Sequence, residues 1–388
     1  MRRDAQPGLG RILGVVGARP NYMKMAPLLR AFAARDDLPG YVLVHTGQHY
    51  DPSMNERLFS DLRLPAPDLN LDVGSGTHAV QTAEIMRRFE PVIDDYAPCC
   101  VVVVGDVNST LACSLVAAKK GIPVVHVEAG LRSFDRAMPE EINRVLTDQL
   151  ADLLYVTEPS GVENLAREGI PAERVQLVGN VMIDSLNEHL PHAPAPGATL
   201  RGAGVPADRT PQEGEYALVT LHRPSNVDQP EALSQITRIL GAVSERIPVV
   251  WPVHPRTSAN LQRFGLEEAV SGDRILRLPP QGYLEMLGLM RGAKVVLTDS
   301  GGVQEETTAL RVPCLTLREN TERPVTIQQG TNMLVGRHQA RILQALDAIL
   351  SGVSAAGSIP ALWDGRAAGR IAEHLARWLA GRDLKLRK

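Results

Sequence analysis

Short apolar runs alternate with longer amphipathic segments from Arg11 to the end of the chain. The runs are rich in Val, Ile and Leu without polar alternation, which predicts strands buried on both faces, as in a parallel sheet covered by helices. We expect them at 12–16, 41–46, 100–105, 123–128, 153–157, 216–221, 248–253, 274–278, 293–297 and 313–317. The pattern therefore predicts an α/β protein with two doubly wound, Rossmann-like domains, whose ligands bind at the carboxyl ends of the strands.

A change in composition separates the two series of strands. Residues 191–197 and 202–215 are rich in Pro, Gly and Ala, which is typical of an interdomain linker. A chain of 388 residues is also long enough for two domains with separate cores. We expect an N-terminal domain at 1–188, a linker at 189–215 and a C-terminal domain at 216–367, with a C-terminal helix at 368–388 that completes the first domain.

Composition and charge argue against several classes of protein. Hydrophobic residues make up 44% of the chain and charged residues 22%, as in ordinary globular proteins. A net charge of -3 argues against a general nucleic-acid binder. The four cysteines lack CxxC spacing, no apolar stretch approaches the roughly 20 residues of a membrane span, and the N-terminus lacks a hydrophobic signal core. These features predict a cytoplasmic protein.

In the first domain, charged residues follow the predicted strands. Arg19 and Lys24 belong to the segment GARPNYMK that opens the first helix, where a cation suits a bound anion. A solvated surface loop is an equally good interpretation of this segment alone. Asp106 follows the strand at 100–105, where capping a helix is the simpler role.

Two further carboxylates strengthen the case for a site in this domain. Glu128 ends a buried strand, where a charge needs a partner or a function, and Glu140 opens a helix beside Glu141. Acidic residues in a first helical turn are common, so one of this pair is expected to be structural. We expect Asp106, Glu128 and Glu140 to converge and to supply the acid and the base of a proton transfer to and from carbon.

In the second domain, the segment TDSGGVQEE at 298–306 joins an apolar strand to a helix. Ser300 can cap this helix, Gly301 and Gly302 allow the backbone to turn, and the first N–H groups can face a phosphate. Glu306 could accept hydrogen bonds from a ribose diol. An ordinary capped junction between a strand and a helix is the alternative interpretation.

Other polar residues of the second domain also follow strands. His222 and Arg223 leave the strand at 216–221 and could face a diphosphate, and His254 repeats this pattern after the next strand. The segment TERP offers Arg323 to phosphate and Glu322 to hydroxyl groups. The spacing of His and Cys matches no zinc site, and a P-loop lysine and GxGxxG are both missing from the sequence, so nicotinamide and ATP are unsupported.

Six segments together resemble one known family. GARPNYMK, VGDVNST, HVEAGLRSFDRAMPEEINRVLTD, TLHRPSN, TDSGGVQEE and TERPVT occur in the order found in the non-hydrolysing UDP-N-acetylglucosamine 2-epimerases. The resemblance covers nearly the whole chain. It implies a glycosyltransferase-B-like fold with a cleft between its domains, a homodimer, and interconversion of UDP-N-acetylglucosamine and UDP-N-acetylmannosamine without a cofactor. The expected partners are the UDP-sugar and UDP, with neither nucleic acid nor a membrane.

Carried over residue by residue, the resemblance implies catalytic roles for Asp106, Glu128, Glu140 and His222. The substrate-binding residues that it implies come from both domains: Arg19, Lys24, Arg144, Arg223, Asn226, His254, Gln281, Ser300, Gly301, Gly302, Glu306, Glu322 and Arg323.

The family's chemistry implies elimination of UDP to a 2-acetamidoglucal, followed by readdition. Direct removal of the C2 proton is implausible because that carbon bears no carbonyl group, whereas loosening of the C1–O bond to UDP makes the proton acidic. Two related reactions remain as alternatives: 2-epimerisation of a UDP-diacetamido-uronic acid, and hydrolysis to free N-acetylmannosamine. A UDP-sugar glycosyltransferase shares the fold but would not need three carboxylates at strand ends.

Several positions depart from the family pattern. Asn21 stands where Glu is expected, Ser225 and Val325 replace Glu, and Met286 replaces an aromatic residue. Gln48 and His49 are retained, but Asp51 replaces the Gln of members that their own substrate activates, and residues 74–78 lack an expected Arg. We therefore expect little or no substrate activation.

Overall fold

The computed structural model describes residues 10–47, 65–353 and 357–386 of the chain, without the side chains of 19 and 383–386. Its contacts divide the chain into two compact units. Unit 1 comprises Met1–Glu188 and Ala361–Lys388, and unit 2 comprises His189–Pro360.

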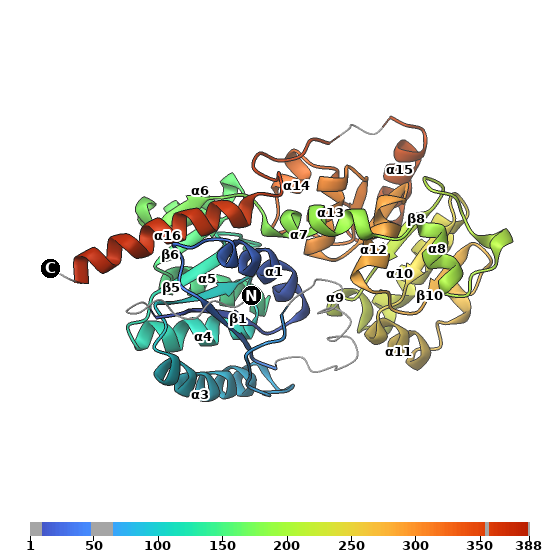
Figure 1. The fold of residues 1–388 in the computed structure, drawn as a ribbon. Coiled ribbons are helices and arrows are strands. Elements are labelled where there is room, and N and C mark those ends of the chain that lie inside the picture. Colours follow the sequence, from blue (N-terminus) through green and yellow to red (C-terminus); the bar gives the residue numbers. More distant parts are fainter. Residues whose placement is uncertain (1–9, 48–64, 354–356, 387–388) are drawn as a thin grey trace. The chain divides into compact units, whose positions relative to one another are not determined.

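Unit 1 is built on a seven-stranded sheet in the order β3-β2-β1-β4-β5-β6-β7, and every neighbouring pair is parallel (Figure 1). Its strands are β1 (Ile12–Val16), β2 (Tyr41–His45), β3 (Leu69–Asn70), β4 (Cys100–Val104), β5 (Val124–Ala129), β6 (Leu153–Val156) and β7 (Val175–Leu177). Its longer helices are α1 (Arg19–Ala33), α3 (His78–Tyr96), α4 (Asn108–Lys119), α5 (Pro139–Leu150), α6 (Pro159–Arg167), α7 (Val181–His189) and α16 (Ala367–Leu386).

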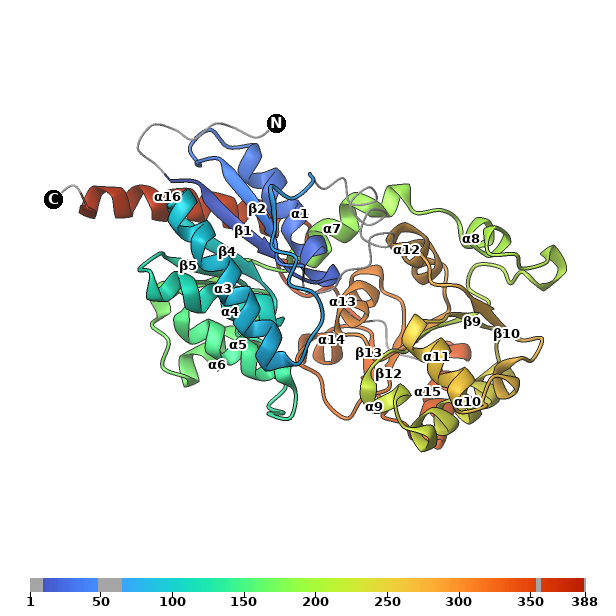
Figure 2. The ribbon, with the colours of Figure 1, turned by 90° about the horizontal axis from the view of Figure 1, so that it is seen from below.

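Both faces of this sheet are covered by helices, which explains why its strands lack polar alternation. Leu13 and Val15 of β1 belong to one apolar core with Phe89 of α3. Gly14 faces the opposite side, where a Cβ would lie 3.2 Å from Sδ of Met25 in α1. Figure 2 shows α1 and α3 on different faces of the sheet.

Helix α16, near the C-terminal end of the chain, belongs to unit 1 rather than to unit 2. The carboxylate of Asp184 accepts hydrogen bonds from the N–H groups of Ala367 (3.1 Å) and Ala368 (2.7 Å) and so caps the helix. Just before it, Nε1 of Trp363 donates to the carbonyl oxygen of Thr157 at 3.1 Å. Helices α1 and α16 then pack side by side (Figures 1 and 2).

Unit 2 repeats the architecture with a six-stranded parallel sheet in the order β10-β9-β8-β11-β12-β13. Its strands are β8 (Ala217–Thr220), β9 (Val249–Pro252), β10 (Ile275–Leu278), β11 (Val295–Thr298), β12 (Cys314–Thr316) and β13 (Asn332–Leu334). Its helices include α8 (Pro196–Gly202), α9 (Pro224–Val227), α10 (Pro230–Ser244), α11 (Pro255–Arg263), α12 (Tyr283–Arg291), α13 (Gly301–Leu310), α14 (Val325–Gln328) and α15 (Gln339–Leu350).

The prediction of two doubly wound α/β domains is confirmed, because both sheets have the parallel order with a central switch that is typical of Rossmann-like folds. Three short strands escaped prediction: β3, β7 and β13. All three lie at a sheet edge, where less apolar surface is buried. The segment expected as a linker contains α8, whose Leu200 is fully buried in a core of unit 2.

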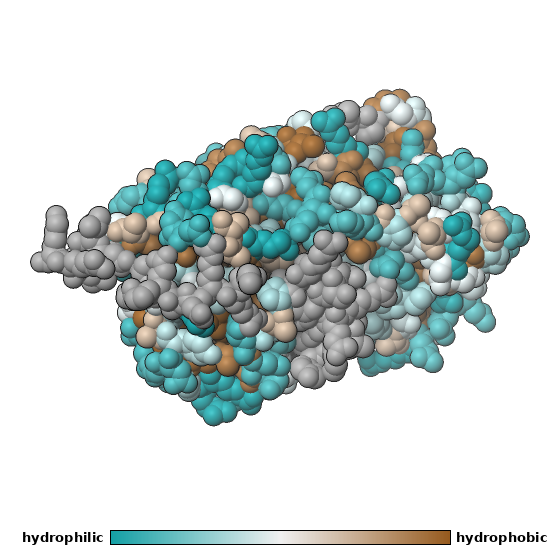
Figure 3. Space-filling model, viewed as in Figure 1, coloured by the Kyte–Doolittle hydropathy of each residue, from teal (hydrophilic) through white to brown (hydrophobic). Residues whose placement is uncertain are grey.

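The surface of the molecule follows from these covered sheets. The face in Figure 3 is mostly hydrophilic, with apolar side chains scattered over it. Within the described residues, the helices are all too short or too polar to cross a membrane.

Candidate active site

The topology brings polar residues together where strand order reverses. In unit 1 the reversal lies between β1 and β4, and in unit 2 between β8 and β11. Loops from the two central strands run to opposite sides there, which leaves room for a ligand at the carboxyl ends. Asp106 follows β4, His222 follows β8, and Ser300 follows β11. The topology therefore places each of these residues beside a switch point of its own sheet.

Glu128 occupies a strained position near the end of β5. Its φ is 75°, in the left-handed region, and the register between β5 and β6 shifts between Val127 and Ala129. A bulge of this kind redirects a side chain, and a left-handed residue other than Gly costs roughly 1–3 kcal/mol. The Glu128 carboxylate is buried and forms an ion pair with the buried ammonium of Lys24.

Gly105 lies directly against this ion pair. A Cβ at this residue would be 3.1 Å from Nζ of Lys24 and 3.4 Å from Oε2 of Glu128, and its φ is 68°. Both the backbone conformation and the lack of space therefore require glycine between β4 and Asp106.

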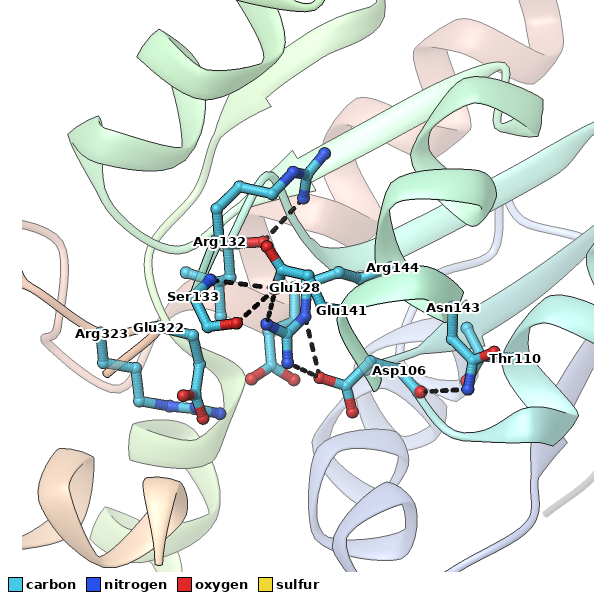
Figure 4. Close-up of polar contacts among 12 residues, drawn as sticks. Asp106, Thr110, Glu128, Arg132, Ser133, Glu141, Asn143, Arg144, Glu322 and Arg323 are labelled. Carbon is cyan, nitrogen blue, oxygen red and sulfur yellow. Dashed lines mark hydrogen bonds and ion pairs between the residues drawn. The ribbon is translucent and has the colours of Figure 1, made fainter. Parts of the chain in front are cut away.

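Arg144 of α5 joins two carboxylates (Figure 4). Its Nη2 lies 2.5 Å and its Nε 3.1 Å from Oδ2 of Asp106, and its Nη1 lies 2.5 Å from Oε2 of Glu141. Asn143 adds a bond from Nδ2 to the carbonyl oxygen of Asp106 at 2.9 Å. The first turns of α5 thus fix Asp106 through its side chain and its backbone.

The two glutamates that open α5 have different environments. Glu141 is buried and accepts hydrogen bonds from the N–H of Ser133, the hydroxyl of Ser133 and the N–H of Phe134, all within 2.9 Å. Glu140 is half-buried, and its side chain makes no hydrogen bond or ion pair with the part of the chain that the structure describes. Glu141 therefore orders the preceding loop, while Glu140 is available to a ligand.

A second buried ion pair lies behind Glu128. Nδ1 of His126 is 2.6 Å from Oδ1 of Asp148, and Nη2 of Arg132 is 2.7 Å from Oδ2 of the same carboxylate. Burial alone would raise the pKa of Asp148, but His126 and Arg132 together hold that pKa below its ordinary value. Asp148 is consequently a buried carboxylate that stays charged.

The start of α1 is held by Asn21, the position where the family resemblance leads us to expect Glu. Its Oδ1 accepts from the N–H groups of Gly17 (3.2 Å) and Ala18 (3.0 Å), and its Nδ2 donates to the carbonyl oxygen of Val104 (2.9 Å). Asn21 thus ties α1 to the end of β4. Arg19 begins α1, and its side chain lies outside the described part of the chain.

In unit 2, the buried carboxylate of Asp299 organises the loop after β8. It accepts hydrogen bonds from the N–H groups of His222 (3.1 Å) and Arg223 (3.0 Å) and from Nδ2 of Asn226 (3.0 Å). Its Oδ1 also lies 3.4 Å from Nδ1 of His222. Asn226 donates in addition to the carbonyl oxygen of Leu317 (3.1 Å), so its amide group supports the loop from within.

The beginning of α13 differs in detail from its prediction. Ser300 is the residue before the first turn, but its side chain makes no capping hydrogen bond. Neither Gly301 nor Gly302 has a positive φ, so the turn itself does not require glycine. A Cβ at Gly301 would instead lie 2.5 Å from Nη1 of Arg323 and 2.8 Å from Oε1 of Glu322. Gly301 therefore makes room for a guanidinium at the positive end of the helix.

Arg323 and Glu322 belong to a buried cluster of charges (Figure 4). Nε of Arg323 lies 2.8 Å from Oε1 of Glu305, and its Nη1 contacts Glu322. Nη2 of Arg318 lies 2.8 Å from Oε2 of Glu322, and Nη2 of Arg223 lies 3.8 Å from Oε1 of Glu322. Glu322, which we expected to contact hydroxyl groups, is thus surrounded by three arginines and orients Arg323 beside α13.

The other residues expected in unit 2 lie in α13 or follow the strands β9 and β10. Glu306 is buried beside Tyr283, and burial together with this carboxylate raises the pKa of the Tyr283 phenol well above its ordinary value. The rings of His222 and His254 lie 5.5 Å apart between centroids. Nε2 of Gln281 donates to the carbonyl oxygen of Pro279 at 2.8 Å.

Each unit thus gathers most of the residues expected from it, together with residues that sequence reasoning missed. Those missed are buried polar side chains: His126, Arg132, Asp148 and Asp299. A single polar residue inside an apolar strand, such as His126 in VVHVEA, is a usable signal, because a charge or ring nitrogen buried there requires a partner. The residues expected to bear on substrate activation, Gln48, His49 and Asp51, lie outside the described residues.

No three His, Cys, Asp or Glu side chains of the described chain are grouped so that they could hold a metal ion.

Known proteins share both the sequence pattern and the fold. A family model described as UDP-N-acetylglucosamine 2-epimerase matches residues 33–376. The UDP-N-acetylglucosamine 2-epimerase of Methanocaldococcus jannaschii is 41% identical over 342 residues, which are 87% of this chain and 91% of that protein. The UDP-2,3-diacetamido-2,3-dideoxy-D-glucuronate 2-epimerase of Pseudomonas aeruginosa is 39% identical over 370 residues, 95% of this chain and 99% of that one.

A solved structure gives the same result. The crystal structure of the Methanocaldococcus jannaschii UDP-GlcNAc 2-epimerase in complex with UDP-GlcNAc and UDP has a TM-score of 0.84 and 39% identity, and the match covers 95% of this chain and 99% of that one. With strand order, buried carboxylates and sequence all in agreement, the chain belongs to the UDP-N-acetylglucosamine 2-epimerase family.

Proposed function

We propose that this protein catalyses the reversible 2-epimerisation of UDP-N-acetylglucosamine to UDP-N-acetylmannosamine. The observation that carries the proposal is a pair of carboxylates at neighbouring strand ends, Asp106 after β4 and Glu128 in β5, each paired with its own cation. A protein that only binds a nucleotide sugar has no need of such a pair. The similarity to a structure in complex with UDP-GlcNAc and UDP supports the same substrate.

The reaction proceeds by elimination and readdition. A carboxylate removes the C2 proton, the electrons of the C–H bond form the C1–C2 double bond, and UDP leaves with the electrons of the C1–O bond. A carboxylic acid then returns a proton to the opposite face of C2, and a phosphate oxygen of UDP attacks C1. No net oxidation occurs, so the cycle needs no redox partner.

Three carboxylates are candidates for the two proton transfers. The side chain of Glu128 is 5% exposed and contacts Lys24, that of Asp106 is 28% exposed and contacts Arg144, and Glu140 is half-buried. Groups in such different surroundings are suited to opposite roles, one as base and another as acid.

Unit 2 provides the groups suited to UDP. The N–H groups at the start of α13, the guanidinium of Arg323 and the ring of His222 would stabilise the diphosphate as it leaves. Glu306, one turn into α13, would accept hydrogen bonds from the ribose. These roles use charge that is already in place when the C1–O bond breaks.

Turnover in heavy water tests the proposal. Incubation with UDP-N-acetylglucosamine in D2O should give UDP-N-acetylmannosamine, and deuterium should appear at C2 of both sugars, as followed by proton NMR. Epimerisation without deuterium at C2 would exclude elimination, and release of free N-acetylmannosamine would indicate a hydrolase. The full-length similarity to a diacetamido-glucuronate epimerase calls for the same assay with that UDP-sugar, for which we expect slower turnover.

We also propose that the protein is a homodimer. Phe134, Ile142 and Leu146 are exposed apolar side chains, the last two one turn apart on α5, and the backbone of Phe134 is bonded to Glu141 of the same helix. Such a group of side chains supports contact with a second copy. Light scattering after size exclusion should give twice the mass of 42.1 kDa. Leu146→Asp should shift the protein to the monomer, and a monomeric wild type would contradict the proposal.

A further inference from the structure

The buried pair of His126 and Asp148 lies next to the proposed site but has no part in the proposed chemistry. Nδ1 of His126 faces Oδ1 of Asp148 at 2.6 Å, and Nε2 faces the carbonyl oxygen of Gly105 at 2.8 Å. Both neighbours are acceptors, so the ring satisfies both only by donating from both nitrogens. The ring therefore connects α5 to the residue that directly precedes Asp106.

The second oxygen of Asp148 reaches the other side of Glu128. Oδ2 accepts from the N–H of Gly130 at 3.1 Å and from Nη2 of Arg132 at 2.7 Å. One carboxylate is thus bonded to both flanks of the Glu128 bulge: through His126, two residues before it, and directly at Gly130, two residues after it.

The bulge needs such support. A left-handed residue other than Gly persists only where its surroundings determine its conformation, because it costs about 1–3 kcal/mol. On the far side of the bulge, Gly130 packs closely against Gly161, since a Cβ added to Gly130 would lie 2.5 Å from the carbonyl oxygen of Gly161. Glu128 is therefore held from both sides by contacts that are themselves buried.

We propose that His126 and Asp148 are positioning residues for the epimerase reaction, holding the Glu128 bulge and the turn from Gly105 to Asp106 in register so that both carboxylates keep the spacing that proton transfer needs. This inference rests on the proposed function. A buried ion pair is weak evidence for stability, since apolar residues of similar volume often serve as well. Positioning of Glu128 and Asp106 explains the buried pair better, because an error of about 1 Å in the position of a reacting group can lower the rate about 100-fold.

Two variants and one matched control test the inference. His126→Phe keeps a ring of similar shape and removes both hydrogen bonds. Asp148→Asn keeps the shape: its amide oxygen can still accept from Gly130, and its amide nitrogen can donate to a neutral His126. Asp152→Asn is the control, because Oδ2 of Asp152 accepts from the N–H of Val124 at 2.9 Å at the amino end of the same strand, away from Glu128.

We expect His126→Phe to lower kcat about 10- to 100-fold with KM within about threefold of the wild type, because ground-state binding is untouched. Deuterium entry at C2 should fall in parallel. Asp148→Asn should lose less, between about threefold and 10-fold, since it retains only part of the geometry. Asp152→Asn should match the wild type.

A second measurement does not depend on turnover. Hydrogen exchange followed by mass spectrometry should show faster exchange of amides at 105–108 and 127–131 in His126→Phe than in Asp152→Asn. If the wild type fails to exchange C2, the proposed function is wrong, and amide exchange still decides whether the pair holds the bulge. A folded His126→Phe with kcat within about threefold of the wild type, or with unchanged amide exchange, would overturn the inference. Should that variant not fold, Asp148→Asn decides by the same two measurements.

Discussion

Two nitrogens of Arg144 donate hydrogen bonds to one carboxylate oxygen of Asp106: Nη2 lies 2.5 Å and Nε 3.1 Å from Oδ2. The third guanidinium nitrogen of Arg144 donates to Glu141, whose carboxylate also orders the loop at Ser133. Asp106 is consequently fixed relative to the first turn of α5, where Glu140 lies. The position of one proposed proton-transfer group thus depends on the planar fork of an arginine.

Replacing this fork by a single ammonium tests its importance. Arg144→Lys keeps the charge but cannot hold Asp106 and Glu141 at once, because lysine offers one point of contact. We expect kcat to fall by about 10- to 100-fold, while the Kd for UDP from calorimetry changes by less than about threefold. Arg87→Lys on α3 is the matched control, since Arg87 is 69% exposed and pairs with Glu84 within the same helix. A loss of UDP affinity as large as the loss of kcat would show that Arg144 contacts the nucleotide.

Lys24 and Glu128 give a prediction about stability. Lys24→Met removes the ammonium that pairs with the Glu128 carboxylate, which is 5% exposed, and should cost about 3–5 kcal/mol in the free energy of unfolding. The double variant Lys24→Met with Glu128→Gln removes the charge as well and should recover most of that loss. Urea denaturation measures both. Equal stability of the single and double variants would mean that the pair is not coupled.

The fold could be predicted from the sequence because most strands are buried on both faces and appear as continuous apolar runs. The edge strands β3, β7 and β13 could not, since Gln176 in β7 and Asn332 in β13 are polar residues in strands of three. Their pairing depends on neighbours that are distant along the chain. The same limit applies to helix α8. The segments on either side of it are rich in Pro, Gly and Ala and suggested a linker, although Leu200 packs into the core.

Candidate site residues could be identified where a polar residue directly follows a buried strand, as with Asp106 and His222. Their partners could not, because the pairing of Lys24 with Glu128 spans 104 residues and that of Asp299 with His222 spans 77. The left-handed conformation of Glu128 also leaves no mark in the sequence. Contacts between distant segments, which create the geometry of the site, follow only from the packed structure.

Gly301 provides a prediction about UDP binding. In Gly301→Ala the new methyl group would lie 2.5 Å from Nη1 of Arg323, so the guanidinium must move away from the start of α13. We expect the Kd for UDP to rise by about 10-fold, or about 1.4 kcal/mol. The control is Gly241→Ala in α10, where a Cβ meets nothing within 4 Å and a helix gains about 0.5–1 kcal/mol from alanine. Unchanged UDP affinity in Gly301→Ala would exclude a role of Arg323 at this position.

The ionisation of Asp184, which caps α16, should make the free energy of unfolding depend on pH. Burial raises the pKa of Asp184 from 3.8 to about 6, and the hydrogen bonds from Ala368 and Ala367 only partly oppose this shift. Between these pH values the folded chain binds more protons than the unfolded chain, so stability must fall as pH rises. This decrease in the free energy of unfolding is complete above about pH 6 and amounts to about 3 kcal/mol at most.

Thermal unfolding between pH 4 and pH 7.5 checks this sign. The free energy of unfolding of the wild type minus that of Asp184→Asn should decrease as pH rises from about 4 to about 6 and then stay level, because asparagine does not titrate in this range. Glu84→Gln on α3 is the control, because the hydrogen bond with Arg87 lowers the pKa of Glu84. Its difference from the wild type should not decrease in that window. A flat difference for Asp184→Asn would mean that the carboxylate ionises normally where it caps α16, so that burial does not govern the charge of this cap.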